Sequence, residues 1–137
     1  MFSLCIPTID RYDSFLKENL KKYLENTLID EIIITDENGN DVDKINKEFN
    51  NHKLKLFKNE KRLGMFFNKI MCCSKANNEW IALIDSDNFA DTNYFEVADE
   101  YLKNNNICKE SILAPSFAKQ NFDYREFQNI IVDKNNL

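Results

Sequence analysis

Residues 32–41 read Ile-Ile-Ile-Thr-Asp-Glu-Asn-Gly-Asn-Asp, a β-branched apolar run that ends abruptly in acidic and turn-forming residues. β-branched residues favour strands, and Asn, Asp and Gly favour the loop that follows a strand. Residues 80–88 repeat this arrangement, because Trp-Ile-Ala-Leu-Ile is followed there by Asp-Ser-Asp-Asn. Continuous apolar runs are typical of strands buried on both faces of a parallel sheet. The two stretches therefore predict an α/β protein with polar loops after its strands.

The rest of the chain alternates between strand and helix patterns. Strands are expected at residues 2–6, 32–34, 53–58 and 80–84, with a fifth near 111–114, and helices at 12–24, 42–49, 65–76 and 91–102. This alternation predicts an α/β, three-layer αβα fold with a mostly parallel twisted sheet. Asp10 or Thr8 is expected to cap the first helix. The uninterrupted run at 80–84 predicts the central strand, whereas the alternating lysines at 53–58 predict a sheet edge.

Composition restricts the class of protein. The chain has 137 residues, 43% hydrophobic and 30% charged, which fits one compact domain. A net charge of −5 argues against a nucleic-acid partner, because such binders carry a positive footprint. No apolar run approaches the ~18 residues of a membrane span, and no basic leader precedes the first strand. The four cysteines lack CxxC spacing, so free thiols and a soluble cytoplasmic protein are expected.

Polar residues gather directly after the predicted strands, where open α/β sheets bind their ligands. The clusters are residues 8–11, 36–41, 59–62 and 85–88. They combine acids with two cations, a mixture that suits a divalent metal ion and a phosphorylated ligand: Asp10, Asp36, Glu37, Asp85 and Asp87 against Lys61 and Arg62. Asp85 and Asp87 could supply carboxylates to Mg²⁺ or Mn²⁺. Turn chemistry and helix capping for the acids, and a solvated surface pair for the two cations, remain open alternatives.

The absence of certain motifs argues against several classes of phosphate-binding site and of catalytic site. The chain has neither G-x-x-x-x-G-K-[ST] nor G-x-G-x-x-G, so the glycine-dependent cradles for ATP and dinucleotides are absent. A metal ion is therefore expected to carry the diphosphate charge. The single histidine, His52, precedes the third strand and lies away from the polar clusters, which predicts a surface residue and argues against Ser–His or Cys–His catalysis.

Four segments carry a family resemblance. Residues 6–8 read Ile-Pro-Thr, and residues 32–41 match a strand followed by Asp-Asp-Gly-Ser-x-Asp, with Glu37 in place of the second aspartate. Within 59–84 the matching residues are Gly64, Asn68, Ala76, Glu79, Trp80 and Ile81. Asp85-Ser86-Asp87 stands at the place of a D-x-D motif. Over residues 2 to about 105 the chain resembles the nucleotide-sugar domain of GT-A fold glycosyltransferases, especially those of family 2.

The resemblance implies a metal-dependent transfer of a sugar from a nucleotide-diphosphate sugar, with a UDP-sugar as the expected donor, to an unknown acceptor. It implies these roles: Thr8 and Asp36 contact the base or ribose with Glu37 beside them, Arg62 contacts the nucleotide, Asp85 approaches the ribose or metal, and Asp87 binds Mn²⁺ or Mg²⁺. Family members carry the catalytic base well downstream of the D-x-D motif, whereas this chain ends fifty residues after Asp87. No catalytic base is assigned, and Glu110, Asp123 and Glu126 are the remaining acidic candidates.

Other functions compete with this interpretation. Residues 1–137 are expected to form a single domain without a full acceptor-binding half, so the chain could be a non-catalytic nucleotide-sugar-binding module or part of a larger glycosyltransferase. A haloacid dehalogenase type of phosphatase ranks lower, because its D-x-D follows an early strand. A sugar nucleotidyltransferase also ranks lower, because residues 7–11 lack the glycine-rich first loop of that class.

Overall fold

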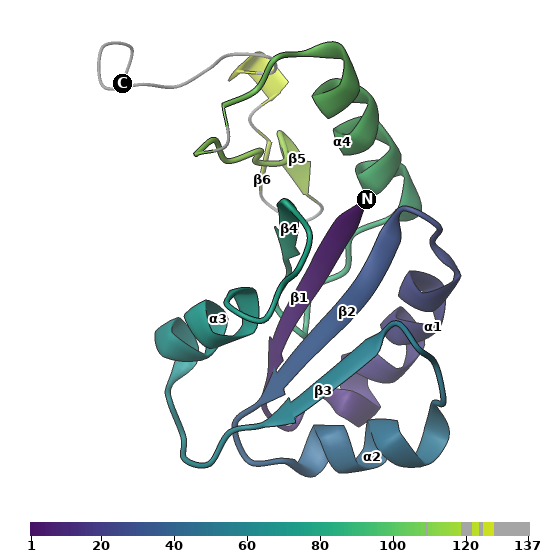
Figure 1. The fold of residues 1–137 in the computed structure, drawn as a ribbon, viewed down its shortest axis with the longest axis vertical. Helices are drawn as coiled ribbons and strands as arrows, with labels where there is room; N and C mark the ends of the chain where they lie inside the picture. Colours follow the sequence, from purple (N-terminus) through teal and green to yellow (C-terminus); the bar gives the residue numbers. More distant parts are fainter. Residues whose placement is uncertain (109, 119–121, 124, 128–137) are drawn as a thin grey trace. The chain divides into compact units, whose positions relative to one another are not determined.

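The computed structural model describes residues 1–108, 110–118, 122–123 and 125–127 (Figure 1). The chain forms two compact units, Met1–Asn106 and Ile107–Leu137. The first unit contains the parallel sheet, both hydrophobic clusters and the four α-helices. The single domain predicted over residues 1–137 stays a prediction.

The sheet of the first unit has four parallel strands in the order β3-β2-β1-β4. The strands are β1 (Phe2–Thr8), β2 (Ile29–Asp36), β3 (Leu54–Lys58) and β4 (Trp80–Leu83). The α/β class is confirmed, and so is the edge position of β3. The central position predicted for β4 is wrong, because β4 forms the other edge of the described sheet. Ile81 and Leu83 are 41% and 45% exposed, which an apolar run alone does not reveal.

All four predicted helices are present. A π-helical turn at Tyr12–Leu16 continues into α1 (Lys17–Glu25), and the others are α2 (Asn40–Glu48), α3 (Met65–Cys73) and α4 (Thr92–Asn104). Asp91 caps α4 by accepting a hydrogen bond from the Asn93 amide at 3.3 Å, as its position predicts. Neither Asp10 nor Thr8 caps the first helix. A residue far along the sequence holds the first turn of this helix instead, because Asp41 accepts a hydrogen bond from the Tyr12 amide at 3.0 Å.

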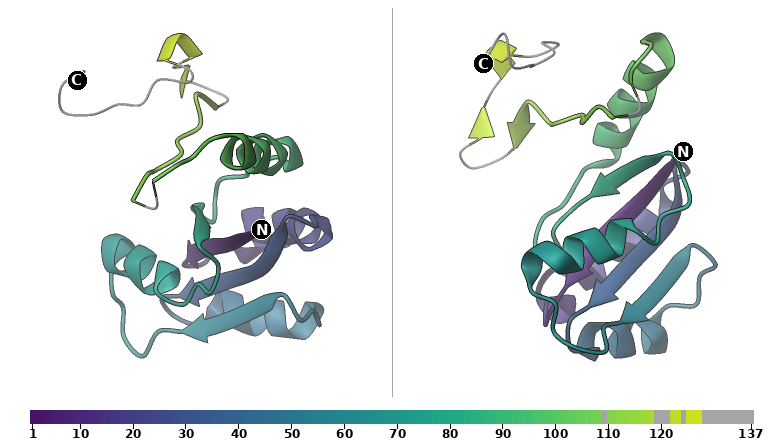
Figure 2. Two further views of the ribbon diagram at one scale, coloured as in Figure 1. Left: turned by 45° about the horizontal axis from the view of Figure 1, so that its top comes forward. Right: turned by 60° about the vertical axis from the view of Figure 1, so that its left-hand side comes forward.

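The helices cover both faces of the sheet, which confirms the three-layer arrangement (Figure 2). On one face, apolar side chains of β1 and β2 such as Leu4 and Ile32 pack in a core that includes Leu20 of α1, Ile45 of α2 and Phe95 of α4. On the other face, alternate residues of the same strands meet α3 in a smaller cluster of Cys5, Ile33 and Cys72. The strand period of two thus assigns neighbouring residues to different layers.

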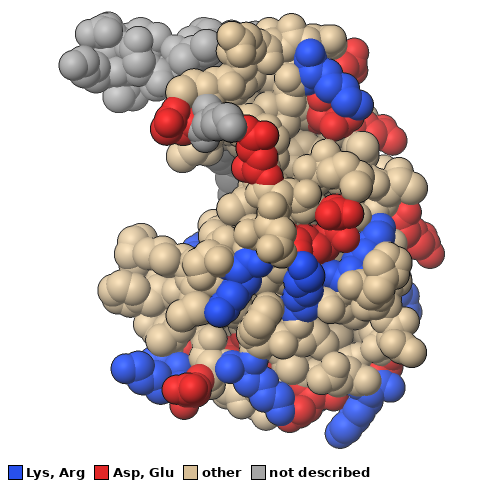
Figure 3. All heavy atoms as spheres, viewed as in Figure 1, with Lys and Arg blue, Asp and Glu red and all other residues tan. Residues whose placement is uncertain are grey.

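The most apolar helix of the sequence, α3, turns much of its apolar surface outward. Its buried residues are Asn68 and Cys72, whereas Met65, Phe66 and Phe67 are 78%, 66% and 62% exposed. This surface forms the uncharged region over α3 at the left of Figure 3. The longest described helix, α4, has 13 residues, and none of the described helices is long and apolar enough to cross a membrane.

The second unit contains only short elements among its described residues. β5 (Phe117–Ala118) pairs antiparallel with β6 (Phe122–Asp123), and a 3-10 turn follows at Arg125–Phe127. The strand predicted near residues 111–114 is wrong, since those residues are in neither strand nor helix. Ile112 is 90% exposed, so the segment has no buried face. Pro115 follows it and has no N–H to donate to a neighbouring strand.

Candidate functional site

The exits of three strands meet at one edge of the sheet. The strand register places Thr8 opposite Asp36 and Asp36 opposite Lys58. Beyond the last pairs, the Glu37 amide donates to the Thr8 carbonyl at 3.1 Å and the Asn59 amide donates to the Asp36 carbonyl at 2.9 Å. The arrowheads of β1, β2 and β3 lie together in Figure 1. We call residues 8–11, 36–41, 59–63 and 85–88 the carboxyl edge.

Asp36 is fully buried and is occupied by the backbone of its own loop. Its Oδ2 accepts hydrogen bonds from the amides of Asp41 at 2.8 Å and Val42 at 3.1 Å, and its Oδ1 accepts from Asn38 at 3.2 Å. A carboxylate at this place satisfies unpaired amides at the start of α2. Asp36 therefore stabilises the turn that begins α2, and its direct contact with a ligand stays a prediction.

Asp41, which the sequence analysis did not single out, joins the exit of β1 to α2. Its side chain is 1% exposed and accepts hydrogen bonds from the Thr8 hydroxyl at 2.5 Å and from the Arg11 amide at 2.9 Å. The sequence signal was its place in the first turn of a helix, where acids are favourable, but that signal does not reveal a partner thirty-three residues away. Thr8 is buried beside it and lies where predicted, at the end of β1.

Glu37 differs from its neighbours because one of its buried oxygens is unpaired. The residue is only 7% exposed, and its Oε2 accepts a hydrogen bond from the Leu63 amide at 2.6 Å. Within the described part of the chain, its Oε1 has no hydrogen-bond partner. An unpaired buried acceptor costs roughly 1–3 kcal/mol, so this oxygen is ready for an N–H or O–H donor. The same contact holds the loop that carries the exposed Arg62 beside Glu37.

The D-x-D residues reach the carboxyl edge from β4. The Ile84 amide donates to the Cys5 carbonyl at 3.0 Å, which continues the pairing of β4 with β1. Asp87 then pairs with Arg11, which follows β1, at 3.9 Å. Asp85 pairs with Lys69 of α3 at 2.7 Å, a partner that the sequence analysis missed because nothing in the sequence tells which side of α3 meets this loop. The structure thus brings Asp87 to the strand exit that also carries Thr8.

The donor set of Asp85 and Asp87 suits a hard divalent cation. Their side chains are 42% and 48% exposed, so water and a ligand can reach the same oxygens. Mg²⁺ is usually held by one or two carboxylates, with water and phosphate completing the shell. Among the described residues there is no group of three or more His, Cys, Asp and Glu side chains that could hold a metal ion alone. A substrate phosphate would therefore have to complete this site.

The remaining candidates are His52 and the three acids considered as a catalytic base. His52 is exposed and precedes β3, which confirms the prediction of a surface residue. Glu110, Asp123 and Glu126 are exposed and belong to the second unit. A bidentate contact from Arg125 lowers the pKa of Asp123, and a contact with Cys108 lowers the pKa of Glu110. Neither shift favours a general base, and no catalytic base is assigned.

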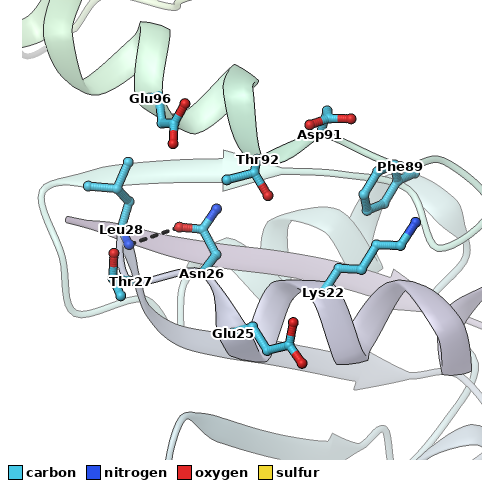
Figure 4. Close-up of a pocket in the computed structure, with 9 residues that line it drawn as sticks. All are labelled: Lys22, Glu25, Asn26, Thr27, Leu28, Phe89, Asp91, Thr92 and Glu96. Carbon is cyan, nitrogen blue, oxygen red and sulfur yellow. Dashed lines mark hydrogen bonds between the residues drawn. The ribbon is translucent and has the colours of Figure 1, made fainter.

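A cavity of about 400 Å³ lies in the first unit between the end of α1 and the start of α4 (Figure 4). Its wall includes Asn26, which accepts a hydrogen bond from the Leu28 amide at 2.9 Å. The Lys22 ammonium lies 4.5 Å from the centre of the Phe89 ring at the same cavity. None of the six residues predicted to bind the donor or its metal lines this cavity.

Comparison with known protein families identifies the family of this chain. The model of glycosyl transferase family 2 matches residues 3–112, which is most of the chain and includes all four parts of the carboxyl edge. The chain belongs to glycosyl transferase family 2. No protein with a curated function matches it significantly.

Solved structures give the same fold. The S. aureus protein TarS, residues 1–349 in complex with UDP, superposes with a TM-score of 0.60 at 18% identity over 75% of this chain and 32% of that one. The same TarS fragment in complex with UDP-GlcNAc gives a TM-score of 0.62 at 19% identity, over 75% of this chain and 31% of that one. This family 2 chain therefore spans about a third of the length of the TarS fragment.

Proposed function

We propose that this family 2 chain binds a nucleotide-diphosphate sugar at the carboxyl edge and, with a bound metal ion, transfers the sugar to an acceptor. The proposed donor is a UDP-sugar. The observation that carries the proposal is the unpaired buried oxygen Glu37 Oε1 after β2. The acids Asp85 and Asp87 follow β4 of the same parallel sheet, and Asp87 pairs with Arg11 after β1. An acceptor for a nucleobase and a pair of carboxylates for a cation are the two features that a uridine diphosphate needs. The TarS complexes with UDP and UDP-GlcNAc support this choice of donor.

The nucleoside is assigned to the loops after β1, β2 and β3. Glu37 Oε1 accepts the N–H of a uracil ring in this proposal, and Asp36 holds the loop that presents Glu37. Thr8 is the last residue of β1 at the same edge, and its hydroxyl donates a hydrogen bond to Asp41. Arg62 is exposed on the loop that contacts Glu37, from which a cationic side chain reaches the nucleotide.

The diphosphate is assigned to the loop after β4. Asp87 and Asp85 would hold Mg²⁺ or Mn²⁺, which when bound supplies positive charge to the departing nucleoside diphosphate. Lys69 and Arg11 now neutralise these two acids. A cation held by the two carboxylates would leave Lys69 and Arg11 free to bind phosphate oxygens of the ligand.

Titration calorimetry with UDP tests the metal-dependent part. With Mn²⁺ present, we expect Asp87→Asn to weaken UDP binding tenfold or more, because one of two carboxylates is lost, and EDTA to weaken binding to the wild type similarly. Glu96→Gln, an exposed acid on α4, is the matched control and should leave the affinity unchanged. Equal UDP affinity with Mn²⁺ and with EDTA would show that the metal has no part in donor binding.

A binding module without turnover is the second candidate. It is favoured by the absence of any acid in the described residues that can be assigned as the catalytic base. Incubation of the chain with UDP-sugars and Mn²⁺ separates the two functions. Release of UDP, with or without an added acceptor, excludes the binding module.

A further inference from the structure

Three cysteines meet where the central strand β1 contacts α3. Cys5 and Cys72 are fully buried, whereas Cys73 is partly exposed, and all are free thiols. The Cys5 sulfur lies 3.6 Å from the Cys72 carbonyl, and the Cys72 sulfur lies 3.3 Å from the carbonyl of Ile33 on β2. The end of α3 is thus packed on the sheet through sulfur contacts, and none of these residues belongs to the carboxyl edge.

The three thiols differ in their chemistry. A hydrogen bond from the Cys5 thiol lowers the pKa of Cys73 to about 7, so a large fraction of Cys73 is thiolate near neutral pH. Hydrogen bonds to Cys72 and Cys73, together with burial, raise the pKa of Cys5, which keeps Cys5 protonated. Cys72 is turned to a backbone carbonyl and is closed to solvent. Cys73 is therefore the more accessible nucleophile. Cys5 is the second thiol, because Cys73 packs against the cluster of Cys5, Ile33 and Cys72.

We propose that Cys73 and Cys5 form a reversible disulfide in the presence of a small-molecule disulfide such as oxidised glutathione, and that this bond joins the end of α3 to β1. The Cys73 thiolate attacks one sulfur of the oxidant, which breaks its S–S bond, forms a mixed disulfide and releases one thiolate. The thiolate released first takes up the proton of Cys5, and the Cys5 thiolate then attacks Cys73 and displaces the second thiolate. Two protein thiols are oxidised and one disulfide is reduced to two thiols.

The bond would act on a helix that also serves the carboxyl edge. Asn68 of α3 donates to the Thr35 carbonyl of β2 at 3.1 Å, and Lys69 of α3 pairs with Asp85. A covalent link at the end of α3 restrains the helix that carries both contacts. The chemistry of the thiols is independent of any nucleotide, so the disulfide stands or falls separately from the proposed function.

The experiment treats the folded chain of residues 1–137 with oxidised glutathione and unfolds it in guanidinium chloride. It then blocks the remaining thiols with iodoacetamide and measures the mass of the intact protein and of its tryptic peptides. We expect two thiols to escape alkylation and peptides 1–11 and 70–75 to appear as one cross-linked species. Dithiothreitol should separate them again. Persistence of a glutathione adduct on Cys73 with a free Cys5, or full alkylation of both, would overturn the proposal.

Variants identify the partner of Cys5, because residues 70–75 contain both Cys72 and Cys73. Cys72→Ala should keep the cross-link and Cys73→Ala should abolish it. Cys108→Ser is the matched control, since Cys108 is exposed and lies in the second unit, and it should change nothing. Fragmentation of the wild-type cross-linked peptide between residues 72 and 73 gives the same answer if a variant does not fold. A bond to Cys72 by either method overturns the assignment.

Discussion

Three acids within six residues, Asp36, Glu37 and Asp41, have three different environments. Asp36 is saturated by backbone amides, Asp41 holds the exit of β1, and Glu37 keeps one oxygen unpaired. The sequence predicted correctly that the acids follow a buried strand. It could not distinguish Glu37 from Asp41, because the environment of each depends on a partner from another part of the chain, Leu63 for Glu37 and Thr8 for Asp41.

Glu37→Gln tests the unpaired oxygen. The amide oxygen of Gln can still accept from the Leu63 amide, which leaves an NH₂ group where Oε1 stands. A donor there cannot accept the N–H of uracil, so calorimetry should give a uridine affinity about tenfold weaker, or about 1.4 kcal/mol. Glu100→Gln alters an exposed acid of α4, outside the carboxyl edge, and should bind uridine as the wild type does. Unchanged affinity in Glu37→Gln would remove Glu37 from the nucleoside site.

Glu31 is a buried acid of β2 with a purely structural set of partners. It accepts hydrogen bonds from the Ser3 hydroxyl at 2.5 Å, from the Asn77 amide at 2.6 Å and from the Lys55 ammonium. Burial alone would raise the pKa of Glu31, but the contacts with Lys55, Ser3 and Asn77 outweigh it and lower the pKa to about 2. The ionised carboxylate therefore links β1, β3 and the loop before β4.

Stability should consequently depend on pH through Glu31. Its pKa in the folded chain, about 2, lies below the ordinary value of 4.5, so its contribution is complete above pH 4.5 and is lost as the pH falls toward 2. We expect Glu31→Gln to lower the free energy of unfolding by about 2–3 kcal/mol at pH 7 and by progressively less below pH 4.5. Urea denaturation at several pH values measures this, with the exposed Glu25→Gln as control. A difference that does not vary with pH would refute the assignment.

At the scale of elements, α3 shows where sequence patterns fail. It is the most apolar of the helices, yet the residues that it buries are Asn68 and Cys72. Asn68 is 2% exposed, donates to the Thr35 carbonyl and accepts from the Asn59 side chain at 3.0 Å. Hydrophobic periodicity locates a helix but does not reveal a polar side chain that bridges two strand exits, because the bridge is a tertiary contact.

Asn68→Leu tests this bridge. The substitution keeps the approximate volume but leaves the Thr35 carbonyl without its side-chain donor, so we expect the free energy of unfolding to fall by about 2–3 kcal/mol. Phe66→Ala on the exposed side of α3 should change it by no more than about 0.5 kcal/mol. Chemical denaturation of both variants measures the contrast. A larger loss in Phe66→Ala would mean that the outer surface of α3 is covered in solution.

At the scale of the whole molecule, alternation of strands and helices was enough to predict the layered α/β fold and the common edge of its polar loops. The position of β4 was not predictable, because an apolar run looks the same in a central strand and in an edge strand that carries exposed Ile81 and Leu83. The division after Asn106 leaves no composition shift in the sequence. Both of these features are decided by contacts between distant segments.

A chain shortened to residues 1–106 should fold by itself. The parallel sheet and both hydrophobic clusters lie wholly within Met1–Asn106, so the packing that stabilises the fold is retained. We expect one cooperative thermal transition, within about 5 °C of that of the full chain, in circular dichroism. A broad, non-cooperative transition would mean that residues beyond 106 complete the core.

The contacts of Asp41 have a consequence for how the carboxyl edge recognises its ligand. One solvent-free carboxylate fixes Thr8, Arg11 and Tyr12 at the same time, and therefore sets the loop after β1 against the start of α2 before anything binds. Binding to such a preorganised surface costs little conformational entropy, because the loops are already ordered. Under the proposed function, a nucleobase of the wrong shape would therefore be rejected, because these loops would not rearrange to fit it.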